Sequence, residues 1–133
     1  MFKKNINNLI IIINIIFFSF YAIQLLIFTD EFALNNLGAF NHAVAALSEI
    51  IGLIFITFVI AFTIIIFRGL EKQLPFIIVI FFFQLLAALN FWRYVLTDSP
   101  GETSFEVITI NGIFFSILSL INFSFILINF KKF

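Results

Sequence analysis

Four uninterrupted apolar runs, each of about 20 residues or more, dominate this sequence and leave few folds open to it. A helix that crosses the hydrocarbon core of a bilayer needs about 20 mostly apolar residues. The runs extend over about residues 9–28, 43–67, 75–95 and 107–130. Strands of a membrane barrel would be about 9–11 residues long and would alternate polar with apolar side chains. Because backbone polar groups in lipid must bond within their own segment, we expect four transmembrane helices.

The composition excludes the soluble alternatives. Hydrophobic residues make up 63% and charged residues 11% of the 133 residues, against roughly 45–50% and 25% in soluble domains. These few charged side chains cannot cover a water-soluble core, so a soluble enzyme, a nucleic-acid-binding protein and a disordered chain are excluded. The length suits one domain, residues 1–133. The sequence therefore predicts an all-α integral membrane domain, a transmembrane four-helix bundle.

Short polar segments separate the runs and predict the topology. Residues 68–74 form a polar hairpin, and Pro75 suits the first turn of the next helix. Pro100-Gly101 marks a turn within residues 97–102. Connections this short place consecutive helices as antiparallel neighbours, which predicts an up-down bundle. The longest connection, residues 29–42, is interpreted either as a short amphipathic helix at the interface or as a loop that dips its Phe side chains into the headgroups.

The charged residues divide unequally between the two sides of this topology. The side with both termini would hold six of the seven basic residues, namely Lys3, Lys4, Arg68, Lys72, Lys131 and Lys132. The other side would hold six of the seven acidic residues, namely Asp30, Glu31, Glu49, Asp98, Glu102 and Glu106. The positive-inside rule then predicts cytoplasmic termini, in a membrane that we expect to be the bacterial inner (plasma) membrane.

Arg93 is the one basic residue on the acidic side, near the outer end of the third span. Glu49 lies about two turns into the second span, at a similar depth, and Glu106 begins the fourth. A charge inside a membrane is costly unless it is paired, so these residues are expected to meet. The sequence predicts an outward-opening polar pocket at this end. Its candidate lining is His42, Glu49, Asn90, Arg93, Tyr94 and Glu106.

Two interpretations of these polar residues stay open. The pocket could hold a lipid headgroup, a quinone ring or an anionic small molecule. Alternatively, Glu49 and Arg93 form a buried pair that fixes helix register, and the Asn side chains make interhelical hydrogen bonds. Gln84 lies on another face of its helix and is interpreted as a contact with another protein. Interhelical polar contacts are expected at Asn14, Gln84, Asn111 and Asn122.

Several kinds of chemistry are excluded by the residues themselves. The chain has no Cys and one His, so it has no disulfide, no zinc–thiolate site and no bis-histidine haem within one chain. It also has no glycine-rich nucleotide-binding motif. We predict no catalytic residue, no metal site and no cofactor, and we favour a function other than an enzyme.

The segment from Phe32 to Asp98 resembles small bacterial four-helix membrane proteins of unknown function, which are similar in size and layout to DoxX-like proteins. The resemblance rests on short motifs: Phe32-Ala33-Leu34, Leu37-Gly38, Glu49-Ile50-Ile51-Gly52, Arg68, Asn90-Phe91-Trp92-Arg93 and Asp98. An arginine or second glycine that is frequent in that family near Ile50 or Ile51 is missing here. The resemblance implies the four-helix architecture and singles out Glu49 and Arg93, but it implies no activity.

The sequence predicts three alternative functions, and the favoured one is given first. The first is a non-catalytic subunit or accessory factor of a membrane complex, with other membrane subunits or further copies of itself as partners in the lipid bilayer. The second is a binder or enzyme for a lipid, quinone or other hydrophobic small molecule, which would use the pocket around Glu49 and Arg93. The third is an oligomeric channel or transporter, which is disfavoured because no charge lies at the membrane midplane.

Overall fold

The computed structural model describes residues 2–98 and 103–130, and within these two ranges its regular structure is entirely helical. Its elements are α1 (Phe2–Leu26), α2 (Thr29–Leu37), α3 (His42–Arg68), α4 (Leu74–Leu96) and α5 (Phe105–Asn129). Four of these helices are long and apolar enough to cross a membrane, as the sequence predicted. Part of the turn expected at 97–102 lies outside the described residues, as do Glu102, Lys131 and Lys132. The side chains of Lys3 and Lys4 are not described either.

The long connection after α1 is a helix, α2, so the first of its two interpretations is correct in secondary structure. Asp30 and Glu31 lie in the first turn of α2, where carboxylates interact favourably with the positive end of the helix dipole. Gly38 ends the helix with a φ of 71°, a left-handed conformation that glycine adopts without steric cost. The chain can therefore reverse within a few residues and begin α3.

Local capping residues set the remaining helix ends. The Asn41 side chain accepts a hydrogen bond from the Val44 amide (3.0 Å) at the start of α3. The Ser104 side chain accepts one from the Val107 amide (3.2 Å) at the start of α5. Both are typical N-cap contacts, which satisfy amides that have no partner within the helix. With Ser104 as its cap, α5 begins at Phe105, before the predicted start at residue 107. The helix α1 also begins earlier than predicted, at Phe2.

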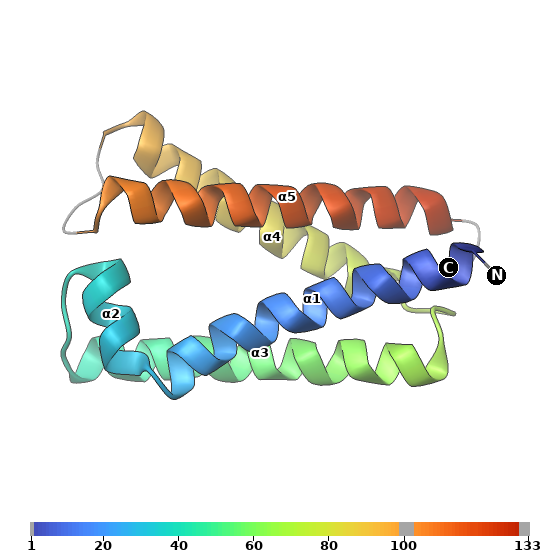
Figure 1. The fold of residues 1–133 in the computed structure, drawn as a ribbon, viewed down its shortest axis with the longest axis horizontal. Helices are drawn as coiled ribbons and strands as arrows, with labels where there is room; N and C mark the ends of the chain where they lie inside the picture. The colour runs from blue at the N-terminus through green and yellow to red at the C-terminus, as the bar shows by residue number, and fades with distance from the viewer. Residues whose placement is uncertain (1, 99–102, 131–133) are drawn as a thin grey trace.

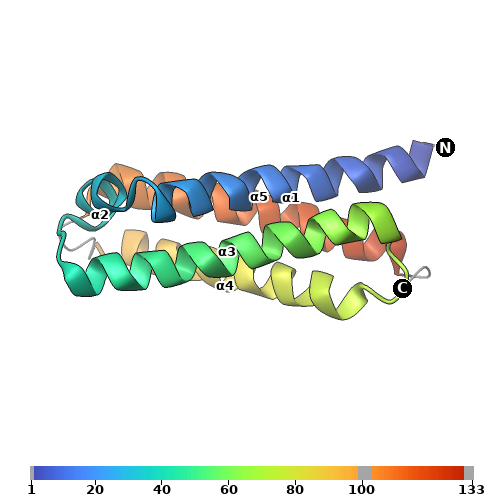
Figure 2. The same ribbon diagram turned by 90° about the horizontal axis from the view of Figure 1, so that it is seen from below.

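The four long helices form two pairs, α1 with α3 and α4 with α5. Near α2, Figure 1 shows the two pairs apart, and towards the start of α1 the ribbons of α1 and α4 approach each other in that view. Figure 2 shows the same bundle from below. The N and C labels lie at one end of the molecule in both views. We call this end, which also holds the connection 69–73, the hairpin end. The opposite end, which holds α2, is the α2 end.

Close packing is strongest within two helix pairs, α1 with α3 and α4 with α5. Gly52 of α3 faces α1 so closely that an added Cβ would lie 2.7 Å from Leu26 Cγ and 3.1 Å from Leu25 Cβ. In the second pair, Trp92 of α4 donates a hydrogen bond from Nε1 to Ser116 Oγ of α5 (2.9 Å). Small residues and short polar contacts of this kind are the usual means of helix association in membranes.

Aromatic rings fill the space between the two pairs in the middle of the bundle. The ring of Phe18 on α1 lies 5.3 Å from that of Phe55 on α3, and Phe55 lies 5.7 Å from Phe83 on α4. The ring of Phe83 continues to Phe115 of α5, at 6.3 Å. Phe18 is fully buried and Phe55 nearly so. The abundant Phe of this chain therefore does more than face lipid, because rings from all four long helices pack together.

Most of the outer surface of the long helices is apolar and exposed. Only 22% of the most hydrophobic window of α3 and of α4 is buried, and the corresponding shares are 33% for α1 and 39% for α5. Exposed side chains include Leu53, Ile60, Leu86 and Leu120. Such a surface would be unstable in water, and it matches the hydrocarbon of a bilayer. The fold thus supports an integral membrane protein.

Candidate functional site

A line of buried polar residues runs between α1 and α5, and we call it the polar seam. On α1 it consists of Asn7, Asn14 and Tyr21, which share one helix face because seven residues make about two turns. Each of them hydrogen-bonds a residue of α5, namely Asn129, Asn122 and Asn111 in turn. The numbers rise on one helix as they fall on the other, so α1 and α5 run in opposite directions along the seam.

The middle of the polar seam is a cluster of three amides from three helices. Gln84 of α4 donates to Asn14 Oδ1 (3.0 Å) and accepts from Asn122 Nδ2 (2.6 Å). Asn14 and Asn122 also bond each other in both directions, at 3.1 and 2.9 Å. All three side chains have an exposed fraction of 0%. The three amides therefore satisfy one another away from water, which a buried polar group requires.

The two ends of the polar seam differ in chemistry. Towards the hairpin end, Asn7 and Asn129 exchange two hydrogen bonds, each of 2.9 Å, and both are buried. Towards the α2 end, the Tyr21 hydroxyl donates to Asn111 Oδ1, and Asn111 Nδ2 donates to the Val107 carbonyl (3.0 Å). The α2 end thus carries a hydroxyl in place of a second paired amide.

Gln84 makes the interhelical polar contact that the sequence predicted, but it is not placed for the contact with another protein that was also expected. Gln84 was expected to contact another protein, but its side chain is fully buried and bonds Asn14 and Asn122 of the same chain. The expectation was wrong because it compared Gln84 only with Asn90 and Arg93 on its own helix. The face opposite those residues points into the bundle, where the polar groups of α1 and α5 are available to it.

A cavity of about 520 Å³ opens at the α2 end, beside the last level of the polar seam. We call it the α2-end cavity. Every helix contributes to its wall, and α2 covers one side through Phe32 and Asn36. The Thr103 hydroxyl donates to the Asn36 carbonyl (2.7 Å), which ties α2 to the segment before α5. Its volume falls within the roughly 300–1,000 Å³ of typical small-molecule sites.

The wall of the α2-end cavity is apolar with a few polar side chains. Leu25, Ile51, Phe55, Phe91, Ile108 and Phe115 supply apolar surface. Tyr21, Asn36, Ser48, Asn90, Tyr94, Thr103 and Asn111 supply hydroxyl and amide groups. None of these described lining residues is Asp, Glu, His, Lys or Arg. The arrangement offers hydrogen bonds and hydrophobic contact but no countercharge.

Only two of the six residues predicted to line an outer pocket do so. Asn90 and Tyr94 line the α2-end cavity, whereas His42, Glu49, Arg93 and Glu106 are not among its lining residues. Those four side chains are all exposed. Asn90 and Tyr94 therefore lie on the wall of a cavity at the α2 end, and the four ionisable residues His42, Glu49, Arg93 and Glu106 lie outside it.

Arg93 does not reach Glu49. Its guanidinium donates to Asn90 Oδ1 (3.3 Å) and lies 4.5 Å from the ring centroid of Tyr94, on its own helix. Figure 1 shows the reason, because α4 leaves the hairpin beside α3 and diverges from it towards the α2 end. Since the two helix ends are separated, similar depth along α3 and α4 does not bring Glu49 and Arg93 together.

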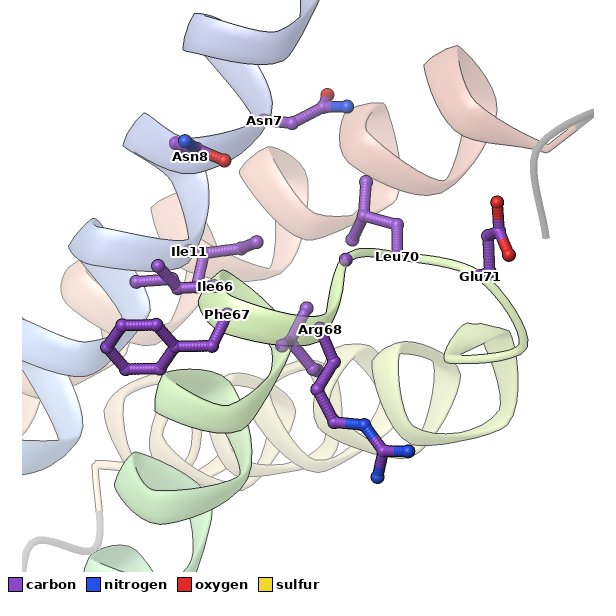
Figure 3. A pocket seen from close by; sticks show the side chains of 10 residues that line it. Asn7, Asn8, Ile11, Ile66, Phe67, Arg68, Leu70 and Glu71 are labelled. Atoms are coloured by element: carbon purple, nitrogen blue, oxygen red, sulfur yellow. The ribbon is translucent and has the colours of Figure 1, made fainter.

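A second cavity of about 670 Å³ lies at the hairpin end, between the start of α1 and the end of α3. Asn7 and Asn8 line one side, and Arg68 and Glu71 line the other. Figure 3 shows the Arg68 guanidinium directed away from Asn7 and from the Glu71 carboxylate. These polar groups do not converge on a common point, so this cavity is a weaker candidate for a binding site than the α2-end cavity.

Comparisons with known proteins found no match for this chain. No family model matches the chain, and no curated protein or solved structure shows significant similarity to it. The resemblance to small four-helix membrane proteins of the DoxX-like layout therefore stays a prediction. The function must be argued from the site itself.

Sequence reasoning missed several residues of the α2-end cavity, above all Tyr21, Ser48 and Phe32. A signal existed for Tyr21, because its spacing from Asn7 and Asn14 placed it on the inner face of α1 together with them. Ser48 directly precedes the more conspicuous Glu49, yet Ser48 is buried and Glu49 is exposed. Phe32 could not be placed without knowing that α2 folds back over the end of the bundle.

Proposed function

We propose that this chain is a small multi-pass membrane protein that binds an uncharged, lipid-soluble molecule in the α2-end cavity. The observation that carries the proposal is the cavity itself, a chamber with a largely apolar wall to which every helix also contributes a residue with a hydroxyl or amide side chain. A concave apolar site with a few polar groups is the usual form of a small-molecule site. The apolar outer surface would keep the site within reach of molecules dissolved in the bilayer.

The chemistry of the wall favours a neutral ligand. A charged group transferred into a site with no countercharge would lose its hydration without compensation, at a cost of many kcal/mol. The Tyr21 hydroxyl and the amides of Asn90 and Asn111 can instead donate to or accept from a carbonyl or hydroxyl of a ligand. Of the ligands considered from the sequence, a quinone ring or an uncharged lipid head fits this wall, and an anion does not.

The proposed orientation places the α2-end cavity on the outer side of a bacterial inner membrane, with both termini in the cytoplasm. The long helices would cross in an antiparallel up-down order, and Arg68 and Lys72 at the hairpin end would obey the positive-inside rule. Asp30 and Glu31, which begin α2, would then lie on the outer side. Labelling of single introduced cysteines from one side of intact cells would test this orientation.

A role as a non-catalytic subunit or accessory factor is the alternative. It rests on the large apolar surface of α3 and α4, which could contact another membrane protein as well as lipid. The expected contact at Gln84 no longer supports it. A channel or transporter has less support, because the middle of the polar seam is filled by mutually bonded amides.

The test is to look for the bound molecule. Protein released from membranes in mild detergent should carry an uncharged small molecule that native mass spectrometry detects as a mass increment. Replacement Ser48→Leu should fill part of the α2-end cavity and reduce the occupied fraction. Ser124→Leu makes the same substitution at an exposed position of α5 and serves as the matched control.

Two results would contradict the proposal. One is wild-type protein without any adduct, and the other is equal occupancy in Ser48→Leu and Ser124→Leu. A second protein chain that co-purifies in fixed ratio while no small molecule is found would favour the accessory function instead.

A further inference from the structure

A third hollow, which Tyr21 also lines, lies between α1 and α5 on their outer face. We call it the α1/α5 groove, and its volume is about 530 Å³. Ile13, Ile16 and Phe20 form its α1 wall, and Phe114, Ile117 and Ile121 contribute from α5. Apart from the Tyr21 hydroxyl, its lining side chains are hydrocarbon or aromatic. A ligand in this groove would therefore lie against an almost entirely apolar surface.

Tyr21 belongs to both sites. It lines the α2-end cavity and the α1/α5 groove, and its hydroxyl makes the hydrogen bond to Asn111 that joins the two helices at this level. The neighbouring ring of Phe17 lines the groove and lies 5.1 Å from Phe115, which lines the cavity. A thin partition of aromatic side chains therefore separates the polar chamber from the lipid-facing groove.

The contact between α1 and α5 is weaker than the contact within each helix pair. Close backbone approach is extensive between α1 and α3 and between α4 and α5, and it is limited between α1 and α5. At the level of Tyr21 the two helices are joined by one side-chain hydrogen bond, in contrast to the reciprocal pair at Asn7. Of the three levels of the seam, this is the one at which a ligand that passes between α1 and α5 would break the fewest hydrogen bonds between them.

We infer that the ligand is a single-chain amphiphile, whose uncharged head occupies the α2-end cavity and whose hydrocarbon chain leaves past Tyr21 into the α1/α5 groove. This inference rests on the proposed function of the cavity. The head finds hydroxyl and amide groups, and the chain finds a groove with the apolarity of the bilayer. A ligand of this form enters sideways from the membrane, so its chain stays in an apolar environment throughout.

A photoreactive monoacylglycerol tests both parts of the ligand. One probe carries a diazirine at the far end of its chain, and a second carries it beside the glycerol head. The full-length protein is labelled in phosphatidylcholine vesicles, with and without an excess of unlabelled monoacylglycerol. Labelling that the competitor removes is counted as specific, and its position is mapped by peptide mass spectrometry.

The chain-end probe is expected to label residues 13–21 and 114–121 specifically, and the head-end probe is expected to label the cavity wall. Ile117→Trp should fill the groove and weaken the competitor by about tenfold, which corresponds to 1.4 kcal/mol. Leu127→Trp is the matched control, since Leu127 lies on α5, is 60% exposed against 50% for Ile117, and does not line the groove. Ile16→Trp on the opposite wall replaces Ile117→Trp if that variant fails to fold by circular dichroism.

The outcomes separate this inference from the proposed function. If Ser48→Leu abolishes head-end labelling while Ile117→Trp behaves like Leu127→Trp, the cavity binds the head and the chain lies elsewhere, which overturns the inference alone. Chain-end labelling spread evenly over all four long helices overturns it as well. If Ser48→Leu leaves the specific labelling by the head-end probe intact, or neither probe labels specifically, the proposed function fails and the inference fails with it.

Discussion

The middle and the α2 end of the polar seam use the same kind of residue in opposite surroundings. In the middle, three amides from α1, α4 and α5 are fully buried, and each is bonded to the other two. At the α2 end, Tyr21 and Asn111 bond each other on the wall of a cavity. The middle is closed by hydrogen bonds among fully buried side chains, whereas the polar side chains at the α2 end lie on the wall of a cavity.

This difference between the middle and the α2 end shows how a small helix bundle can be stable and still bind a ligand. Buried polar groups in lipid are tolerated only when they are satisfied, so the closed cluster around Gln84 holds the two helix pairs in register. Polar groups beside a cavity can be satisfied by water or by a ligand, so they are free to exchange partners. Variants that remove one partner should therefore cost most in the middle of the seam and least at its α2 end.

The largest loss is expected for Asn14→Leu. This change removes every hydrogen bond that Asn14 makes and leaves Gln84 Nε2 and Asn122 Oδ1 without these partners in a dry interior. An unsatisfied buried polar group costs about 1–3 kcal/mol. Unfolding by SDS, followed by circular dichroism, should show a loss of this size. A loss below that of Tyr21→Phe would contradict the comparison.

The control for this prediction removes the whole cluster. In the variant Asn14→Leu/Gln84→Leu/Asn122→Leu, no polar group is left unsatisfied at this level. Replacing all members of a buried polar network by apolar residues is frequently neutral or stabilising. The triple variant should therefore be more stable than Asn14→Leu alone. If the triple variant is the less stable of the two, the hydrogen bonds contribute more than their desolvation costs.

A smaller effect of about 1 kcal/mol is expected where α1 packs on α3 near the α2 end. Gly52→Ala would place its Cβ 2.7 Å from Leu26 Cγ and 3.1 Å from Leu25 Cβ, so the Leu26 side chain or α1 itself must shift, and overpacking of a close contact costs about 1–3 kcal/mol. The better helix propensity of Ala offsets about 1 kcal/mol of that cost. Thermal unfolding in detergent should show the loss.

Gly112→Ala is the matched control for that variant. Its Cβ would lie 3.4 Å from Phe91 Cβ, which needs little adjustment, so the gain in helix propensity should leave this variant as stable as the wild type or more stable. Equal destabilisation by both substitutions would mean that the two helix pairs are packed alike. A loss of stability in Gly52→Ala but not in Gly112→Ala would indicate that α1 and α3 are packed more tightly than α4 and α5 at these positions.

These contrasts also show which parts of the fold and of the site could be predicted from the sequence alone. The four spans follow from run length, and the inner faces of α1 and α5 follow from the spacing of Asn7, Asn14 and Tyr21 and of the asparagines at 111, 122 and 129. Such periodicity identifies a face of a helix, but it does not identify the helix opposite. The cluster depends on the Gln84 side chain of α4 reaching Asn14 of α1 as well as Asn122 of α5, and no local pattern shows which of these side chains meet.

The charged residues were misleading for a related reason. Depth in the membrane can be counted from the ends of a helix, and by that count Glu49 and Arg93 lie at similar levels. Their lateral separation depends on how α4 diverges from α3, which is set by packing of α4 on α5 (Figure 1). The cost of a charge in a membrane singles out Glu49 in the sequence, and no comparable cost singles out Ser48 or Phe32. Ser48 and Phe32 nevertheless line the α2-end cavity, and Glu49 does not.

Tyr21→Phe should cost little stability, on the order of 0.6 kcal/mol, which is the average for an interhelical hydrogen bond in a membrane protein. Asn111 Oδ1 lies beside the α2-end cavity, where water can replace the lost hydroxyl. Ligand occupancy, in contrast, should fall, because the variant removes a donor and acceptor from the wall. Native mass spectrometry and SDS unfolding of the same preparation would separate the two effects, and a large stability loss with unchanged occupancy would contradict the assignment.

The smallest effect is expected for Arg93→Leu, and this variant decides between the pocket predicted from charge and the cavity found in the structure. Arg93 is exposed, and within the described structure its guanidinium contacts Asn90 and Tyr94 of its own helix. An exposed substitution of this kind changes stability by no more than about 0.5 kcal/mol. A pocket built on a Glu49–Arg93 pair would instead lose its ligand and leave the Glu49 carboxylate without its partner. Unchanged ligand occupancy in Arg93→Leu, beside reduced occupancy in Ser48→Leu, would place the site within the bundle and make it independent of the charges at its rim.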